Sequence, residues 1–367
     1  MQRYCNPREI PAFSDPYYAR RNRFHFGPNT RLDTQIKVTA PPQLLAEPLT
    51  SSGHRIEFLL FSYVPAYKQL LKLMDQRSRA MLRETVRRLP ELSILADILG
   101  RGEGDSCVSF YNKGGVTGNC NAKFFFAFHR GEANGRRNFK AMLANENIVG
   151  GFAPPYKTSD NGVRMELCGW RALLLSLIAV AFGLTVFKRP QHKLLAEGFC
   201  TGLVGIDSRA GAPLRHQTSG EFKDDRAELD RLLKVEKHQE GRRQQGYYTL
   251  HLNKMGSANG YARLGRYTAN FLDADGHASK RYRNATLSQS NGPLLNALAR
   301  KLKNAFDLQH IKIHAQRRQR PNHKKPYTMY ISRADSVTLR GHLARFSYST
   351  ARDPRGISFW NIIYTDE

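Results

Sequence analysis

Cysteine is scarce in this chain, and its few cysteines form neither a metal-ligand pattern nor a disulfide framework. There are five among 367 residues, an odd number, and no two have the CxxC spacing of a zinc ribbon. We therefore expect reduced thiols in an intracellular compartment. The five are Cys5, Cys107, Cys120, Cys168 and Cys200.

Apolar runs long enough for a membrane are also lacking. The N-terminal MQRYCNPREIP has no apolar stretch of the kind found in secretory signals. The one membrane-like run, Ala172–Phe187, has 16 residues, whereas a spanning helix needs about 20. We interpret it as a buried helix and expect no membrane partner.

Acidic residues are greatly outnumbered. The chain has 31 Asp and Glu against 57 Lys and Arg, a formal net charge of +26. Such an excess favours a polyanionic partner, most simply nucleic acid, although ribosomal and membrane-surface proteins share it. With 41% hydrophobic residues, the chain can form two or three domains with real cores.

The most informative stretch is Tyr267–Gly276, YTANFLDADG, a helix-forming segment that ends in two acids and a glycine. A helix C-terminus carries partial negative charge, so each acid there is unfavourable by a few tenths to about 1 kcal/mol. Hard carboxylate oxygens at such a place indicate Mg²⁺ or Ca²⁺. An ordinary Asp-Gly turn after a helix is the alternative.

The segments that follow alternate between strand and helix patterns. Ala285–Gln289 is a short strand, and leucines at spacings of three and four make Leu294–Asp307 an amphipathic helix. Ile311–Ala315 and Tyr327–Ser332 alternate like the strands of a basic hairpin, and Ser336–Phe346 is a further helix.

This order resembles the LAGLIDADG family of homing endonucleases and intron maturases. The match is TANFLDADG, Thr268–Gly276, with Thr268 where the family has Leu and Asn270 where it has Gly. The family has two strands before the middle helix, and only one is clear here.

A degenerate first copy is found by comparison. Leu92–Gly104, LSILADILGRGEG, is a helical run whose Glu103 and Gly104 align with Asp275 and Gly276, the acids lying 172 residues apart, 275 against 103. Downstream come predicted strands and helices and then a lysine-containing segment, Leu184–Phe199. The predicted elements are strands Cys107–Tyr111, Lys123–His129 and Val163–Leu167, and helices Asn138–Leu143 and Trp170–Phe182.

The resemblance implies an α+β fold of two pseudo-symmetric αββαββα repeats, which form a saddle of antiparallel sheets. We expect an N-terminal arm and basic helical extension at 1–90 and the first, degenerate repeat at 91–205. A charged linker or insertion follows at 206–259, and the second repeat occupies 260–367.

The resemblance also implies a site. The two motif helices would pack together and bring Glu103 and Asp275 to the bottom of the saddle, where Mg²⁺ relieves their repulsion. Lys188 corresponds to the basic residue near the scissile phosphates. Candidate DNA-binding residues lie on strand and hairpin segments: Lys113, Lys123, Arg130, Arg136 and Arg137 in the first copy, and Lys280, Arg281, Arg283, Gln289, Arg317, Arg318, Arg320, Lys324 and Lys325 in the second.

The function implied is an intron-encoded, site-specific endonuclease that hydrolyses phosphodiester bonds of double-stranded DNA with Mg²⁺. We expect a monomer in a mitochondrion or chloroplast. The alternative is an RNA maturase that binds its own intron RNA and assists group I splicing without DNA cleavage. A basic structural RNA-binding protein is a third possibility, but it leaves LDADG unexplained.

Overall fold

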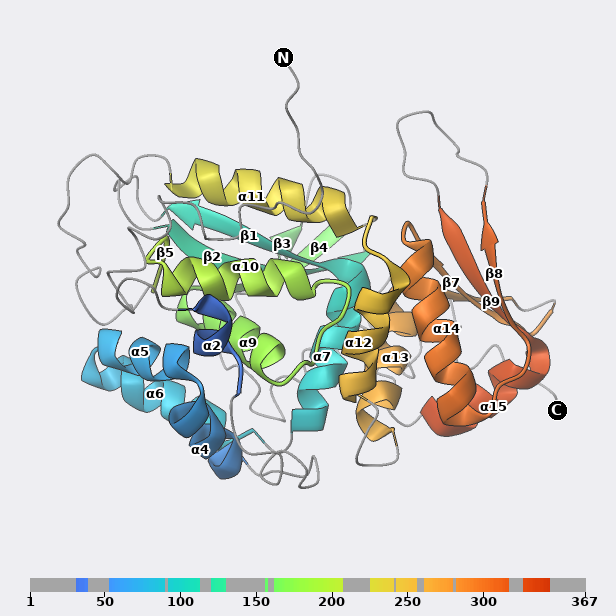
Figure 1. Cartoon of the computed structure of the whole chain (residues 1–367), viewed down its shortest axis with the longest axis horizontal. Coiled ribbons are helices and arrows are strands. Elements are labelled where there is room, and N and C mark those ends of the chain that lie inside the picture. Colours follow the sequence, from blue (N-terminus) through green and yellow to red (C-terminus); the bar gives the residue numbers. More distant parts are fainter. Residues whose placement is uncertain are drawn as a thin grey trace, which may run out of the picture.

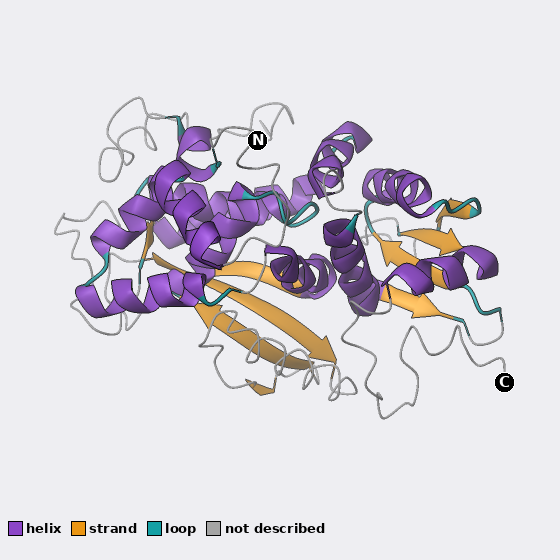
Figure 2. Cartoon of the chain, turned by 90° about the horizontal axis from the view of Figure 1, so that it is seen from below, coloured by secondary structure: helices purple, strands orange, loops and turns teal. Residues whose placement is uncertain are grey.

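The computed structural model describes residues 31–38, 53–89, 92–112, 120–129, 156–157, 162–206, 225–240, 242–255, 261–279, 282–316 and 326–343. Two antiparallel-rich sheets, each covered by helices, lie on either side of a central pair of helices (Figure 1, Figure 2). The α+β class expected from the sequence is confirmed.

The first sheet is formed by residues that alternate between its two faces. Phe124, Phe126 and Phe128 of one strand are at most 2% exposed and face the core, as the period-two pattern requires. The sheet order is β1-β2-β4-β3, with β5 added parallel to β2. The elements are α7 (Leu92–Asp105), β1 (Ser106–Asn112), β2 (Cys120–His129), β3 (Tyr156–Lys157), β4 (Gly162–Cys168), α9 (Trp170–Ala181), α10 (Arg189–Cys200) and β5 (Val204–Gly205).

The second sheet repeats this topology. Its order is β6-β7-β9-β8, so in both sheets the first two strands pair, and the fourth strand lies between the second and the third. Of the two strands expected before the middle helix, the unclear one is β6, which is only three residues long. The elements are α13 (Ala262–Asp275), β6 (Gly276–Ala278), β7 (Ala285–Gln289), α14 (Gly292–Phe306), β8 (Ile311–Ala315), β9 (Tyr327–Ile331) and α15 (Arg333–Leu343).

The segment expected as a linker contains two packed helices, α11 (Asp225–Glu240) and α12 (Gln245–Met255). Leu229, Leu232 and Leu233 of α11 belong to the core of the first repeat. Tyr248 and Leu252 of α12 belong to the core of the second. This connection is therefore built into both halves. The helix predicted at Asn138–Leu143 lies outside the described residues.

The N-terminal extension packs on the first repeat and shares its core. Part of its positive charge is neutralised within the protein, because Arg83 and Arg87 both pair with the buried Glu57 at 2.5 Å. None of the described helices combines the length and hydropathy that a membrane crossing requires. The extension consists of α2 (Leu32–Ile36), α4 (Gly53–Tyr63), α5 (Pro65–Leu73) and α6 (Gln76–Arg87).

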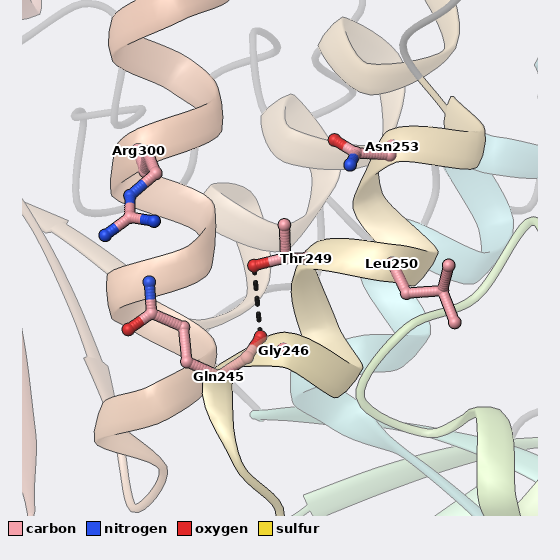
Figure 3. A pocket seen from close by; sticks show the side chains of 6 residues that line it. All are labelled: Gln245, Gly246, Thr249, Leu250, Asn253 and Arg300. Atoms are coloured by element: carbon pink, nitrogen blue, oxygen red, sulfur yellow. Dashed lines mark hydrogen bonds between the residues drawn. The ribbon is translucent and has the colours of Figure 1, made fainter.

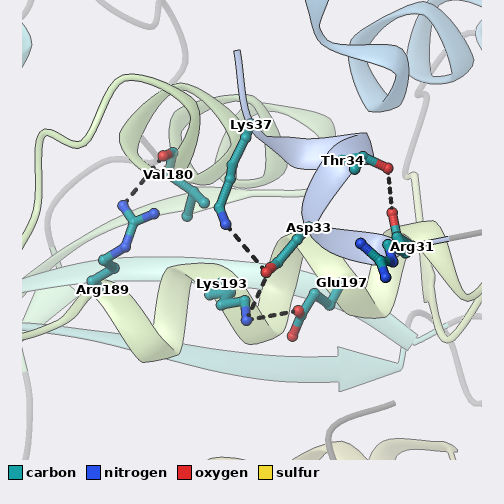
Figure 4. Close-up of polar contacts among 8 residues, drawn as sticks. All are labelled: Arg31, Asp33, Thr34, Lys37, Val180, Arg189, Lys193 and Glu197. Carbon is teal, nitrogen blue, oxygen red and sulfur yellow. Dashed lines mark hydrogen bonds and ion pairs between the residues drawn. The ribbon is translucent and has the colours of Figure 1, made fainter. Parts of the chain in front are cut away.

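One ion-pair chain attaches α2 to α10 (Figure 4). Lys193 lies between two carboxylates, 3.2 Å from Asp33 and 3.1 Å from Glu197. Asp33 also pairs with Lys37 at 3.1 Å. Burial raises the pKa of Glu197 to about 7, although the nearby ammonium of Lys193 opposes the shift.

Candidate active site

The two motif helices α7 and α13 lie side by side at the centre of the molecule (Figure 1, Figure 2). Glycines of α7 allow this close approach. A Cβ atom at Gly100 would lie 2.5 Å from the carbonyl oxygen of Tyr267, and one at Gly104 would lie 2.7 Å from the Cβ of Ala274. Because both separations are shorter than real Cβ contacts, only glycine fits at these two positions.

A buried polar contact joins the same two helices further along. Asp97 is fully buried and receives a charged hydrogen bond from Arg266 at 2.6 Å and another from Asn270 at 3.0 Å. Asn270, which departs from the family pattern, therefore has a defined partner across the interface. The close approach of the two helices is therefore provided mainly by the glycines of α7.

The equal lengths of α7 and α13 show which residues of the two motifs correspond. Both helices have 14 residues; their first residues are 92 and 262 and their last are 105 and 275, a difference of 170 at each end. In both repeats the next residue begins the first strand of the sheet. Asp105 is therefore the counterpart of Asp275, and Glu103 is the counterpart of Asp273. The alignment of Glu103 with Asp275 expected from the sequence is therefore wrong by two residues.

Glu103 lies inside the protein and not at the helix end. It is fully buried and accepts hydrogen bonds from Thr185 Oγ1 at 2.8 Å and from the backbone N–H groups of Val186 at 2.8 Å and Lys188 at 2.9 Å. Burial raises the pKa of this carboxyl, and the three hydrogen bonds oppose the shift. Both oxygens are engaged in fixing the segment before α10, so this carboxylate does not have the accessibility that a metal ligand needs.

Asp275 is the half-buried last residue of α13 and lies against the last turn of α7. A Cβ atom at Gly104 would be 2.7 Å from the Asp275 carboxylate. The carboxylate accepts a hydrogen bond from the side-chain amide of Gln289, at the end of β7. Gln289, one of the predicted DNA-binding residues, therefore orients the carboxylate of Asp275, the acid of the motif that matches the family pattern better.

Asp105 has a different partner. Arg101, one turn earlier on α7, places Nη2 3.2 Å from Asp105 Oδ2 and donates from Nη1 to the backbone carbonyl of Asp273 at 2.9 Å. The guanidinium also lies 4.9 Å from the ring centre of Phe128. The side chain of Asp105 is 27% exposed, and that of Arg101 only 8%. Asp105 therefore reaches the surface with a buried cation at its side.

Lys188 immediately precedes α10 and is only partly buried. Its backbone N–H donates to Glu103, and its ammonium lies 5.0 Å from the ring centre of Phe187. These contacts attach it to the Glu103 side of α7. Its role beside a scissile phosphate stays a prediction.

The carboxylates at the ends of α7 and α13 are suitable ligands for a hard divalent cation, but there are too few of them to enclose one. In the described part of the chain there is no group of three or more His, Cys, Asp or Glu residues that could enclose a metal. Asp105 and Asp275 could supply two carboxylate ligands from separate helices, and substrate phosphates and water would have to supply the rest. Mg²⁺ is commonly bound in this way.

Among the predicted DNA-binding residues, the structure describes Lys123, Arg283 and Gln289. Lys123 forms an ion pair with Glu166 on the neighbouring strand, which offsets its charge. Arg283 occupies the turn between β6 and β7 with a φ of 50°. The others lie outside the described residues: Lys113, Arg130, Arg136, Arg137, Lys280, Arg281, Arg317, Arg318, Arg320, Lys324 and Lys325.

The outward face of the second sheet carries polar residues that the sequence reasoning missed. Thr286 pairs across the strands with Tyr330, which pairs with Lys312; Ser288, Thr328 and His314 form the next row. The hydroxyl groups of Ser288 and Thr328 are 3.0 Å apart. No acidic residue lies in these two rows. The alternation of the strands is the signal in the sequence that places these side chains on one face, and all the candidates on these strands and hairpins except Gln289 are charged residues.

A separate hollow lies between α12 and α14 (Figure 3). It has a volume of about 430 Å³ and is lined by Gln245, Gly246, Thr249, Leu250, Asn253 and Arg300. The hydroxyl of Thr249 donates to the backbone carbonyl of Gln245 at 3.1 Å. None of these residues belongs to the helix ends that carry the acids.

Comparison with known proteins gives matches only at the level of structure. No family model and no curated protein matches the chain. Among solved structures, variants of the homing endonuclease I-DmoI match 70% of this chain and 98% of theirs, with 12% identity and a TM-score of 0.36. I-AabMI bound to uncleaved DNA matches 69% of this chain and 83% of its own, with 13% identity and a TM-score of 0.37.

A third match is I-LtrWI bound to target DNA, with 7% identity, a TM-score of 0.37, and coverage of 69% of this chain and 82% of its own. I-DmoI and I-LtrWI are homing endonucleases, and I-AabMI is a meganuclease. The latter two are described as LAGLIDADG proteins. At such low identity and TM-score the likeness decides nothing about this chain, and its assignment depends on its own motif and geometry.

Proposed function

We propose that this chain is a LAGLIDADG-type endonuclease that cuts double-stranded DNA at a specific site. The observation that carries the proposal is the central helix pair. Two helices of equal length pack through Gly100 and Gly104, end in Asp105 and Asp275, and lead into two sheets of the same topology. This arrangement presents one acid from each repeat.

The chemistry proposed is hydrolysis of one phosphodiester bond in each strand. A water molecule gives up one proton and its oxygen bonds to phosphorus. The bond from phosphorus to the leaving sugar oxygen breaks, and this sugar oxygen takes up a proton. Asp275 and Asp105 would hold Mg²⁺, and an ion held there would supply positive charge to stabilise the attacking and leaving oxygens. Gln289 would fix the orientation of the Asp275 carboxylate through the hydrogen bond that it already donates.

The outward face of the second sheet is the proposed reading surface. Its hydroxyl, imidazole and ammonium groups can donate to or accept from base edges in a major groove, which admits a β-ribbon. Residues with this role include Thr286, Ser288 and His314. The net charge of +26 supports binding to the phosphate backbone. The intron-encoded context, the organelle and the monomeric state stay predictions of the family resemblance.

The test needs a target, which selection can supply. Purified full-length protein is used to enrich binding sequences from a library of random DNA duplexes without divalent cations, and Mg²⁺ is then added. We expect cleavage of the selected duplex, abolished by Asp275→Asn and by EDTA. The variant should retain DNA binding, because a carboxylate is replaced by an amide of the same size.

Glu103 and Asp105 provide an internal comparison. Asp105→Asn should impair cutting without unfolding the protein, whereas Glu103→Gln should lower its stability, because a buried acceptor of three hydrogen bonds is altered. Selective binding with no cleavage under any divalent cation would favour the maturase function, which predicts binding to a group I intron RNA. Undiminished cutting by Asp275→Asn would refute the proposed site.

A further inference from the structure

Helix α4 of the N-terminal extension exposes two aromatic rings to solvent. Phe58 is 52% exposed and Phe61 is 48% exposed, and no other phenylalanine in the described part of the chain is exposed to this extent. They are three residues apart, so both lie on one face of the helix. The ring of Tyr63 has its centre 6.2 Å from that of Phe58. Apolar rings grouped on one helix, rather than scattered singly, indicate a surface that a partner covers.

Two lysines of the next helix, α5, continue this surface. The ammonium of Lys68 lies 5.4 Å from the ring centre of Phe61. Lys72 is one turn later on the same face of α5, and both lysines are exposed. Neither forms an ion pair within the described part of the chain, so their charges are available to a partner. Phe58, Phe61, Lys68 and Lys72 are called the aromatic-basic strip below.

The strip combines flat apolar faces with positive charge, and a single strand of nucleic acid has the complementary chemistry. Its unpaired bases stack on aromatic rings, and its phosphates bind cationic side chains. A duplex is not complementary in this way, because its bases are already stacked on one another and are paired. The formal net charge of +26 favours a polyanion over an acidic protein segment as the partner.

We propose that the aromatic-basic strip binds single-stranded nucleic acid, with bases stacked on Phe58 and Phe61 and phosphates held by Lys68 and Lys72. The extension packs on helices of the first repeat, and α4 and α5 lie far along the molecule from the second sheet (Figure 1). The strip is therefore separate from the sheet surface proposed to read duplex DNA. It provides a second nucleic-acid contact that does not depend on cleavage.

The experiment measures single-strand binding to the full-length protein by fluorescence anisotropy. The probes are labelled oligothymidylate and oligouridylate, and excess unlabelled random duplex occupies the surfaces that bind double-stranded DNA. One variant combines Phe58→Ala with Phe61→Ala. A second combines Phe58→Leu with Phe61→Leu, which keeps the apolar surface and removes the flat rings. The matched control is Leu250→Ala on α12, where the side chain is 57% exposed.

Each ring removed should weaken single-strand binding by about 5-fold to 140-fold, which corresponds to the loss of one stacked base at about 1–3 kcal/mol. The double leucine variant should also bind weakly, and Leu250→Ala should bind like the parent protein. Lys68→Gln together with Lys72→Gln should reduce the slope of log K against log salt by about 1.4, since each phosphate on a single strand contributes about 0.7. A loss with either probe supports the proposal, and the probe with the larger loss shows whether DNA or RNA is preferred.

Unchanged single-strand affinity in the folded double alanine variant would overturn the proposal, and so would full affinity in the double leucine variant. If the double alanine variant fails to fold, as judged by circular dichroism, the double leucine variant decides. Sedimentation tests the alternative occupant: a dimer of the parent protein that Phe58→Ala and Phe61→Ala abolish, with single-strand binding intact, would assign the strip to a second copy of this chain. Ring-dependent single-strand binding by a protein that never cuts DNA would support the strip and refute only the proposed endonuclease function.

Discussion

Replacing Gly100 by alanine tests the central helix contact directly. In an ordinary helix interior, Gly→Ala is stabilising by about 1 kcal/mol. At Gly100 the added Cβ would lie 2.5 Å from the carbonyl oxygen of Tyr267 and 2.9 Å from its Cα. Both are backbone atoms of another helix, so no side chain can rotate away, and α7 and α13 must separate. Overpacking of this kind costs about 1–3 kcal/mol, and more when the backbone itself must move.

The clash should outweigh the gain in propensity, so we expect Gly100→Ala to lower the free energy of unfolding by about 1–2 kcal/mol. Gly341→Ala on α15 is the matched control, because nothing lies within 4 Å of its added Cβ. The same substitution there should be neutral or stabilising by up to about 1 kcal/mol.

Urea unfolding followed by far-ultraviolet circular dichroism measures both effects, with the midpoint as the observable and the slope as a check on cooperativity. The two variants should shift the midpoint in opposite directions. If Gly100→Ala were as stable as Gly341→Ala, the close approach of α7 and α13 would be wrong, and with it the pairing of Asp105 with Asp275.

Two further predictions concern buried charges. The pKa of Glu197, raised by burial from an ordinary 4.5 to about 7, means that the folded state retains a proton that the unfolded chain has lost. The parent protein should therefore lose up to about 3 kcal/mol of stability as pH rises from 4.5 to 7, and Glu197→Gln should lack this loss when urea midpoints are compared across that range. Asp97→Ala should lower the free energy of unfolding by about 3 kcal/mol or more, because it leaves Arg266 and Asn270 without their acceptor at the helix interface. Asp230→Ala, which removes an exposed ion pair with Arg226, should cost less than about 1 kcal/mol, and equal effects at both sites would contradict the buried role of Asp97.

The second repeat could be predicted well from the sequence because its periodicities are strong. The strand expected at Ile311–Ala315 has those bounds in the structure, and the helix expected at Leu294–Asp307 spans Gly292–Phe306. The difference at its start has a local cause: Asn291 caps the helix by accepting a hydrogen bond from the N–H of Leu294, with Pro293 in the first turn.

The match of Glu103-Gly104 to Asp275-Gly276 gives the wrong register because α7 continues two residues beyond Glu103. Glu103-Gly104 resembles Asp275-Gly276, but the helix continues to Asp105, and Ser106 begins the strand. A glycine is not needed at that position to start β1. Glu103 and Asp105 differ in their surroundings. Glu103 accepts hydrogen bonds from the backbone of Val186 and Lys188, more than eighty residues away, and no local sequence pattern predicts such contacts.

The two motif helices also show why each is hard to identify alone. In their common register, the contact of Gly100 with Tyr267 is equivalent to the contact of Asn270 with Asp97. At the first crossing a glycine allows backbone contact, and at the second an amide and a carboxylate form a hydrogen bond at 3.0 Å. The two helices are joined by one close backbone contact and one polar contact, so neither helix needs the whole LAGLIDADG motif. The first helix has the glycines of the interface and the second has the LDADG sequence, although both helices end in an acid, Asp105 and Asp275.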